Sequence, residues 1–321
     1  METNGFGPVR SPVTPDASTA TRELLDLLYR VSGRRLLSGQ HNQPAHGSGW
    51  TEKITALTGR TPVVWGLELG FSPPGTLDAV DRRDANLAEA IAWHRRGAVI
   101  AVTWHAVCPV DDEPVAFEGG VLRDDFTAEQ YEVLTPGSRL HQRWAAQVDV
   151  AAGLLRRLAD AGVPVLWRPY HEMNGPWFWW GGQPERLTRL WRLLFDRLTV
   201  HHRLTNLVWV WNPNSAYGGT PPVSPFYPGG DVVDVLATDT YGGHYEPEHY
   251  EVLLRLADGR PIGLGECGAL PPDETLTAQP RWCWFMAWPT QVTAENTVER
   301  IREFYAHPRV VTLESPDLRS I

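Results

Sequence analysis

The chain is poor in cysteine and in lysine. Its 3 cysteines, Cys108, Cys267 and Cys283, are an odd number in a sequence of 321 residues, which is long enough to bury a large core, so no disulfide framework is expected. Lysine occurs once, at Lys53, and the formal net charge is −9. With no basic stripe to set against that charge, a nucleic-acid partner is not expected.

Long apolar runs and several familiar motifs are missing as well. Nowhere do roughly 18 apolar residues follow one another, so no membrane span is expected. The stretch from Met1 to Thr21 lacks the apolar core of a signal peptide, which by itself favours the cytoplasm. There is no Gly-x-Ser-x-Gly elbow, no phosphate loop, and no second histidine placed after His171 as in a zinc protease helix. We therefore expect neither a metal nor a cofactor.

What the chain does contain is a regular succession of short apolar runs. A flexible leader is expected over residues 1–15, and a single catalytic domain over residues 16–321. The domain is expected to begin with a helix over residues 16–32, capped by Asp16 or Ser18. The apolar runs that follow are Arg35–Gly39, Pro62–Gly70, Ala98–Ala106, Val163–Glu172, Asn206–Asn214, Val232–Gly242, Arg260–Gly268 and Trp282–Pro289.

Helical patterns separate most of these runs. They cover Asn86–Arg95, Ser138–Ala161, Pro184–His201, His249–Ala257 and Ala294–Ala306. Strands followed by helices favour parallel pairing with right-handed crossovers. Eight such units without a Gly-rich first turn predict an α/β fold, a (β/α)₈ TIM barrel in a single domain, in which functional residues lie where the strands end.

Each run indeed closes on polar or aromatic residues, for which a buried strand has no structural need. They are Gln40-His41-Asn42, Glu68, Trp104-His105, His171-Glu172, Trp211-Asn212, Asp239-Thr240-Tyr241, Glu266 and Trp288. Because the ends of parallel strands meet at one end of a barrel, this pattern predicts a ring of loops around one pocket.

The segment from Trp167 to Gly181 suggests what the pocket binds. Its apolar strand leads to the carboxyl of Glu172, and four aromatic rings follow at residues 177–180. A carboxyl moves protons and indole faces stack on sugar rings, so the segment is typical of a sugar site. The alternative is a strand that leads into an aromatic core cluster.

A second carboxyl, Glu266, ends the seventh run. Two converging carboxyls suit cleavage of a glycosidic bond, with retention at a separation of about 5–5.5 Å and inversion at about 6.5–9.5 Å. Period-two alternation places Arg168, Tyr170 and Glu172 on one face of their strand. Arg168 is the candidate that keeps a carboxylate ionised, the alternative being an ordinary ion pair inside the barrel. Glu68 and Asp239 are an alternative working pair.

The stretch Gly263 to Gly268 also matches the dinucleotide fingerprint Gly-x-Gly-x-x-Gly. It lies at the seventh run, is followed by two prolines in place of a helix start, and carries a glutamate where phosphate would approach. Nucleotide binding is therefore not expected.

The sequence Arg168-Pro169-Tyr170-His171-Glu172-Met173-Asn174-Gly175, with Trp177, Trp179, Trp180 and Gly181, resembles glycoside hydrolase family 26, best known for endo-β-1,4-mannanases. The likeness spans roughly residues 35 to 305 and implies that Glu172 is the acid/base and Glu266 the nucleophile. It implies substrate contacts from Trp104, His105, Arg168, His171, Trp177, Asp239, Tyr241 and Trp288. The alternatives are structural roles for the two histidines and core positions for Trp177 and Trp288.

Two positions depart from the family's pattern. Cys108 stands where an Asn is expected before Pro109, and Glu68 where the family often has Asp. The resemblance implies a retaining hydrolase of β-1,4-mannan, acting on a β-linked polysaccharide or oligosaccharide, and we expect a monomer. Alternatives are another β-glycan, such as xylan or mixed-linkage glucan, and a catalytically silent carbohydrate-binding barrel. Most relatives act outside the cell, which is at odds with the missing export signal.

Overall fold

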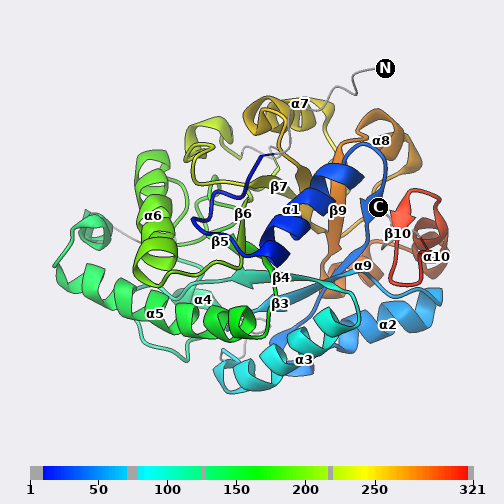
Figure 1. Ribbon diagram of the computed structural model, residues 1–321. Helices are drawn as coiled ribbons and strands as arrows, with labels where there is room; N and C mark the ends of the chain where they lie inside the picture. Colours follow the sequence, from blue (N-terminus) through cyan, green and yellow to red (C-terminus); the bar gives the residue numbers. More distant parts are fainter. Residues whose placement is uncertain (1–9, 71–77, 124–127, 216–219, 317–321) are drawn as a thin grey trace.

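A computed structural model describes residues 10–70, 78–123, 128–215 and 220–316 of the chain. A closed barrel of parallel strands lies at its centre (Figure 1). The first barrel strand is split into β1 and β2, and closure comes from β9, which pairs with β8 and with both halves of that first strand. The strands are β1 (Leu36–Leu37), β2 (Gly39–His41), β3 (Val64–Glu68), β4 (Val99–Trp104), β5 (Val165–Pro169), β6 (Leu207–Trp211), β7 (Val235–Thr240), β8 (Ile262–Cys267), β9 (Trp282–Ala287) and an outer β10 (Val310–Val311), paired with β1.

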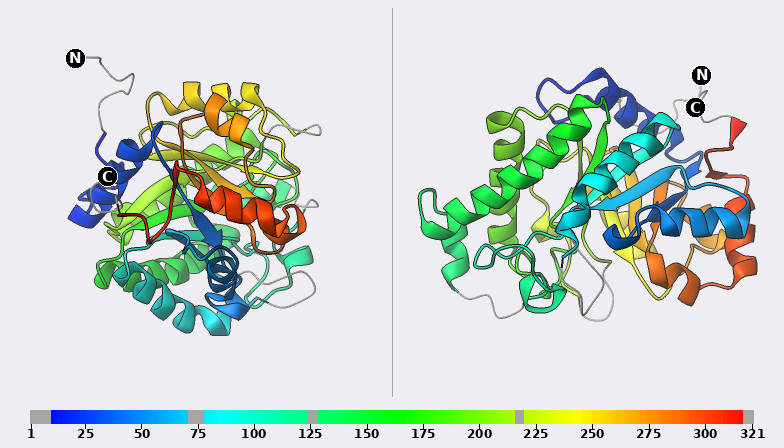
Figure 2. Two further views of the ribbon diagram at one scale, coloured as in Figure 1. Left: turned by 90° about the vertical axis from the view of Figure 1, so that its right-hand side faces the viewer. Right: turned by 90° about the horizontal axis from the view of Figure 1, so that it is seen from below.

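Helices surround the barrel on its outside (Figure 2). The helices are α1 (Thr19–Val31), α2 (Gly49–Thr58), α3 (Arg83–Arg95), α4 (Phe117–Gly120), α5 (Arg139–Asp160), α6 (Pro184–Asp196), α7 (Pro247–Ala257), α8 (Asp273–Ala278), α9 (Pro289–Ala294) and α10 (Val298–Ala306). Short 3₁₀ turns occur at Pro44–His46, Val80–Arg82, Ala128–Leu134 and Ser224–Phe226. The predicted (β/α)₈ barrel is confirmed, since every predicted apolar run contains a strand. Within the described part of the chain, no helix has the length and apolarity needed to cross a membrane.

Two predicted helices differ from the observed ones in detail. The pattern over residues 184–201 contains α6, which ends at Asp196 and continues as a π-helical turn over Arg197–His201. The pattern over residues 294–306 contains only the second of two helices, because α9 ends at Ala294 and α10 begins at Val298 after a Thr297 cap.

The amino-terminal segment closes the end of the barrel at which the strands begin. Ser18 caps α1 by accepting the Thr21 amide at 3.1 Å, and the apolar face of α1 packs with valines that point into the barrel. Residues 10–15, the second part of the predicted leader, are anchored there: Thr14 Oγ1 donates to Leu207 O at 2.7 Å. Residues 1–9 of the leader lie outside the described residues.

Alternation along the strands divides the core into two layers. Side chains such as Leu166 and Val208 point into the barrel, where α1 covers them. Their strand neighbours Trp167 and Trp209 point outward into the layer between strands and helices. Burying each such large side chain contributes about 1.5–3 kcal/mol. The inner layer is apolar at the end where the strands begin. The polar side chains lie at the other end, where the strands finish.

Candidate active site

Glu266 faces the barrel interior because β8 is bulged beside it. Strict alternation would turn Glu266 outward, as its neighbour Leu264 belongs to the outer layer. The pairing with β7 slips by one residue here: Thr238 pairs with Leu264, but Asp239 pairs with Glu266. The extra residue, Gly265, therefore re-aims the carboxylate inward, as a β-bulge does.

Only glycine fits at that bulge. A Cβ on Gly265 would lie 1.6 Å from Asn212 Oδ1 and 2.9 Å from Asp239 Oδ1. The glycines that resemble a nucleotide fingerprint thus let β8 pass close to its neighbours, and they aim Glu266 into the pocket.

Arg168 of β5 joins three strands through its guanidinium. It donates to Glu266 Oε1, to Asp239 Oδ2 at 3.1 Å and to Thr103 Oγ1 at 3.0 Å. Burial lowers the pKa of Arg168, but the carboxylates of Asp239 and Glu266 outweigh it and raise that pKa, so the cation is kept. Arg168 and Asp239 are 5% and 0% exposed, which suits them to hold Glu266 and leaves them little surface for a sugar.

Glu266 accepts hydrogen bonds from two donors of this group, Arg168 and Tyr241. Burial and then the charge of Glu266 raise the pKa of Asp239, although Arg168 opposes them. Tyr241, just past β7, donates its hydroxyl to Glu266 Oε2 at 2.5 Å. Burial and the same carboxylate raise the pKa of Tyr241, so the phenol keeps its proton and remains a donor. Hydrogen bonds from a cation and a phenol thus hold the Glu266 carboxylate in place.

Glu172 enters the site through a sharp change in the backbone. β5 ends at Pro169, and Tyr170 and Glu172 take left-handed φ values of 49° and 52°. The predicted alternation is therefore wrong for Tyr170, whose hydroxyl accepts from Trp144 Nε1 of α5 at 2.8 Å, in the outer layer. The Glu172 amide donates to Asn212 O at 2.7 Å, which ties this turn to the end of β6.

The surroundings of the Glu172 carboxyl favour its protonated form. Burial first, then the charge of Glu266, raise its pKa to about 8, while the Trp177 hydrogen bond and Arg168 oppose the rise. Trp177 Nε1 donates to Glu172 Oε2 at 2.8 Å. The indole reaches it by folding over Gly175, where a Cβ would lie 2.1 Å from the ring. One carboxyl is thus protonated at neutral pH beside another that pairs with a cation, the division of roles that acid-assisted glycoside cleavage needs.

Three histidines, His41, His105 and His171, line the site. His105, which follows β4, donates from Nδ1 to Glu68 Oε2 at 2.7 Å. The glutamate side chain, longer than the aspartate that the family often has here, therefore reaches from β3 to the end of the neighbouring strand β4. Burial, and then nearby His105 and Arg168, lower the pKa of His171 well below its usual range. Burial and Arg168 do the same for His41. His171 Nε2 lies 3.7 Å from Glu266 Oε1 and meets the His105 ring edge-on at 4.4 Å.

The aromatic rings divide between pocket and core. Trp177 and Trp288 are half-buried, and the Trp288 ring lies 4.5 Å from that of His41. Phe178, Trp179 and Trp180 are buried, and the two indole N–H groups bond Ala106 O and His171 O. The predicted contact Trp104 is 3% exposed and stacks on Trp167 in the outer layer. Its placement favours packing, as does that of Cys108, which is fully buried there.

Several residues of this site have contacts that the sequence alone did not indicate. Thr103 holds Arg168, His41 supports Trp288, and Asn212 accepts the Glu172 amide. Ala101 points into the barrel, so period-two alternation along β4 indicates that Thr103 points inward as well. His41 and Asn212 stand at strand ends, where the barrel fold already predicts functional residues.

One group of possible metal ligands lies inside the site. Donor atoms of His171, Asp239 and Glu266 lie within 4.8 Å of one another. Arg168 already donates to both carboxylates and is only 5% exposed, so its guanidinium has no room to turn away in favour of a metal ion. The donor set therefore fits proton transfer better than metal chemistry.

A (β/α)₈ barrel with a protonated carboxyl, a cation-paired carboxylate and half-buried indoles at its strand ends has the architecture of a barrel glycoside hydrolase. The chain belongs to glycosyl hydrolase family 26, whose sequence model matches residues 13–315.

Individual relatives agree with this membership. A mannan endo-1,4-beta-mannosidase of Thermothelomyces thermophilus is 33% identical over 95% of this chain, which spans 63% of that relative. Among solved structures, GH26A from Muricauda sp. is 39% identical with a TM-score of 0.89, covering 94% of this chain and 98% of that one. A GH26-CBM35 β-(1,4)-mannanase of Podospora anserina is 33% identical with a TM-score of 0.80, over 96% of this chain and 69% of that one. The chain thus spans less than two thirds of the curated relative's length.

Proposed function

We propose that the chain is a retaining hydrolase of β-1,4-mannan and related oligosaccharides, with Glu266 as the nucleophile and Glu172 as the acid/base. The observation that carries the proposal is the contrast between the two carboxyls. Glu266 pairs with Arg168 and Tyr241, while burial and the charge of Glu266 raise the pKa of Glu172 to about 8. The relatives named as mannosidases supply the substrate class.

The reaction proceeds in two displacements. Glu266 attacks the anomeric carbon while the glycosidic bond breaks, and Glu172 gives its proton to the departing sugar oxygen. A glycosyl-enzyme ester on Glu266 results, and Glu172 is left ionised. Glu172 then takes a proton from water, whose oxygen attacks the same carbon and releases Glu266. The product keeps the β configuration, and both carboxyls return to their starting states.

The remaining side chains hold the sugar and the catalytic groups. Trp288 is the platform under the sugar being cleaved, and Trp177 borders the same subsite while it contacts Glu172. His105, oriented by Glu68, and His171, whose pKa burial lowers, present their rings toward the substrate. Arg168 and Asp239 act through Glu266, and Trp104 packs on Trp167 in the outer layer.

Release of reducing ends from galactomannan, glucomannan, xylan and barley glucan tests the proposal. We expect release from the mannans, with the β-anomer formed first as seen by NMR. Glu266→Gln is expected to lower kcat by about 10⁴–10⁶-fold, as removal of a nucleophile does. Release of reducing ends from xylan or barley glucan alone would show that the substrate is that glycan and not mannan. Binding of mannan without release of reducing ends would indicate a carbohydrate-binding barrel.

A further inference from the structure

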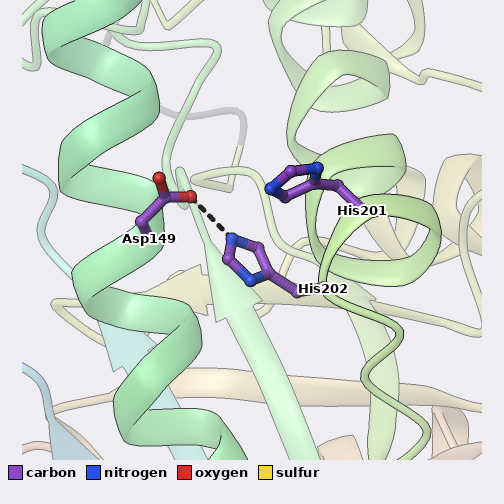
Figure 3. Close-up of side chains that lie close together, drawn as sticks. All are labelled: Asp149, His201 and His202. Atoms are coloured by element: carbon purple, nitrogen blue, oxygen red, sulfur yellow. Dashed lines mark hydrogen bonds and ion pairs between the residues drawn. The ribbon is translucent and has the colours of Figure 1, made fainter.

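Asp149, His201 and His202 form a side-chain cluster on the outer surface, between α5 and the turn that follows α6 (Figure 3). One donor atom of each lies within 4.8 Å of the other two. His202 Nε2 donates to Asp149 Oδ1 at 2.6 Å, and the two imidazole rings stand perpendicular with centroids 4.8 Å apart.

An uncommon backbone turn brings the two imidazoles together. After Asp196 the helix widens into a π-helical turn over Arg197–His201, a form that is often found at functional sites. The amide of His202 donates to Arg197 O at 2.9 Å, and Arg156 donates to His202 O. Figure 3 shows both histidines reaching from this turn toward Asp149 on α5.

The donor set suits a transition metal. Two imidazoles and one carboxylate are common ligands of Zn²⁺, and imidazole also suits Cu²⁺ and Ni²⁺. The ligands can be reached from solvent, since the side chains of Asp149 and His202 are 41% and 25% exposed. An open hollow of about 760 Å³, lined by His201 and Arg197 among others, adjoins them.

Arg197 both orients the carboxylate and weakens the site. Its Nε and terminal nitrogen donate to Asp149 at 2.8 and 2.6 Å, which fixes the carboxylate as an outer-shell partner does. Its positive charge repels a metal ion, so only moderate affinity is expected. A purely structural ion-pair cluster would need only Asp149, Arg197 and His202. It would not require His201 beside them, whereas a metal site uses His201 as a ligand.

We propose that Asp149, His201 and His202 bind a divalent transition metal of the zinc class, which joins α5 to the end of α6. The cluster precedes β6, so it lies at the end of the barrel opposite to the catalytic carboxyls. The metal therefore acts on stability. A ligand that binds only the folded chain raises the unfolding temperature, by an amount that grows with the concentration of free ligand.

The test uses the full chain, without a histidine tag and stripped of metal with EDTA, titrated with ZnCl₂ in a calorimeter and in thermal melts. We expect one equivalent of Zn²⁺ to bind and to raise the unfolding temperature. His201→Ala removes an exposed side chain and is expected to weaken binding by at least about tenfold, since loss of an outer-shell partner alone costs that much. Asp149→Asn, which removes the carboxylate ligand, should do the same.

The matched control is His46→Ala, another exposed histidine, in the 3₁₀ turn after β2. It should bind Zn²⁺ as the parent does. Zinc held at the catalytic carboxyls would survive His201→Ala and disappear in Glu266→Gln. That result, or the lack of saturable binding in the parent, would overturn the proposal.

Discussion

Trp177 donates its indole N–H to Glu172 Oε2 at 2.8 Å, over a separation of only 5 positions in the chain. The bond stabilises the ionised carboxylate and so opposes the burial that raises the pKa of Glu172. The same ring is half-buried and borders the proposed sugar subsite. Under the proposed function, stacking of the substrate and the proton affinity of Glu172 are therefore coupled through one side chain.

Replacing Trp177 by phenylalanine should shift the alkaline limb of the activity profile. In the parent, kcat/KM is expected to fall as Glu172 loses its proton, near its pKa of about 8. Trp177→Phe keeps a ring but removes the donor, so the pKa of Glu172 rises and the limb moves to higher pH. Initial rates on soluble galactomannan across neutral and alkaline pH measure this. Trp288→Phe is the control and should leave the limb in place, and an unmoved limb in Trp177→Phe would contradict the coupling.

Glu172→Gln should change how stability depends on pH. The folded-state pKa of Glu172 is raised to about 8 from an ordinary 4.5. Above pH 4.5 the unfolded chain gives up this proton while the folded chain keeps it, so stability falls with rising pH until the folded carboxyl ionises near pH 8. The variant lacks this loss. Its gain in unfolding temperature over the parent should grow between these limits and then level off, as thermal melts would record. A constant difference would count against the raised pKa. Its kcat should fall by about 10²–10⁴-fold.

Arg168→Met should damage both activity and stability. It leaves the buried carboxylates of Asp239 and Glu266 facing each other without a cation, and breaking a buried ion pair in this way costs about 3–5 kcal/mol. Loss of the group that orients the nucleophile should lower kcat by about 10²–10³-fold. Denaturant unfolding and steady-state kinetics measure the two effects.

Arg192→Met supplies the matched comparison for that variant. Arg192 pairs with Asp231 on the surface, where the two side chains are 47% and 65% exposed. Such pairs contribute about 0–1 kcal/mol, so this variant should stay close to the parent. Equal losses of activity and stability in the two variants would show that Arg168 contributes no more than an arginine on the surface.

Gly265→Ala should destabilise the barrel at the nucleophile. The new methyl would meet Asn212 Oδ1 and Asp239 Oδ1, and overpacking of this kind costs about 1–3 kcal/mol. Any shift of β8 also turns Glu266, so kcat should fall with little change in KM. Gly153→Ala, in α5 with open space around it, should instead stabilise by about 0.5–1 kcal/mol. Full activity in Gly265→Ala would exclude a role of the bulge in aiming Glu266.

The fold and the centre of the site could be predicted because each depends on local pattern. Apolar runs alternating with helical periodicity specify strands and crossovers, and parallel strands bring their ends together. Glu172 and Glu266 therefore meet although their positions are far apart in the sequence. The cap at Ser18, one of the two predicted candidates, and the start of α5 after Ser138 each depend on a few adjacent residues.

Which ring meets a sugar and which way each carboxyl turns were decided by tertiary packing. Of the four rings after Glu172, three are buried, and Trp104 stacks on its strand neighbour Trp167, because helices cover the outer face of the strands. The left-handed backbone at Tyr170 sends that side chain outward, and the slip at Gly265 turns Glu266 inward. Successive side chains along a strand point to opposite faces of the sheet, but a single extra residue reverses this order. Only the pairing with the neighbouring strand shows where the extra residue lies.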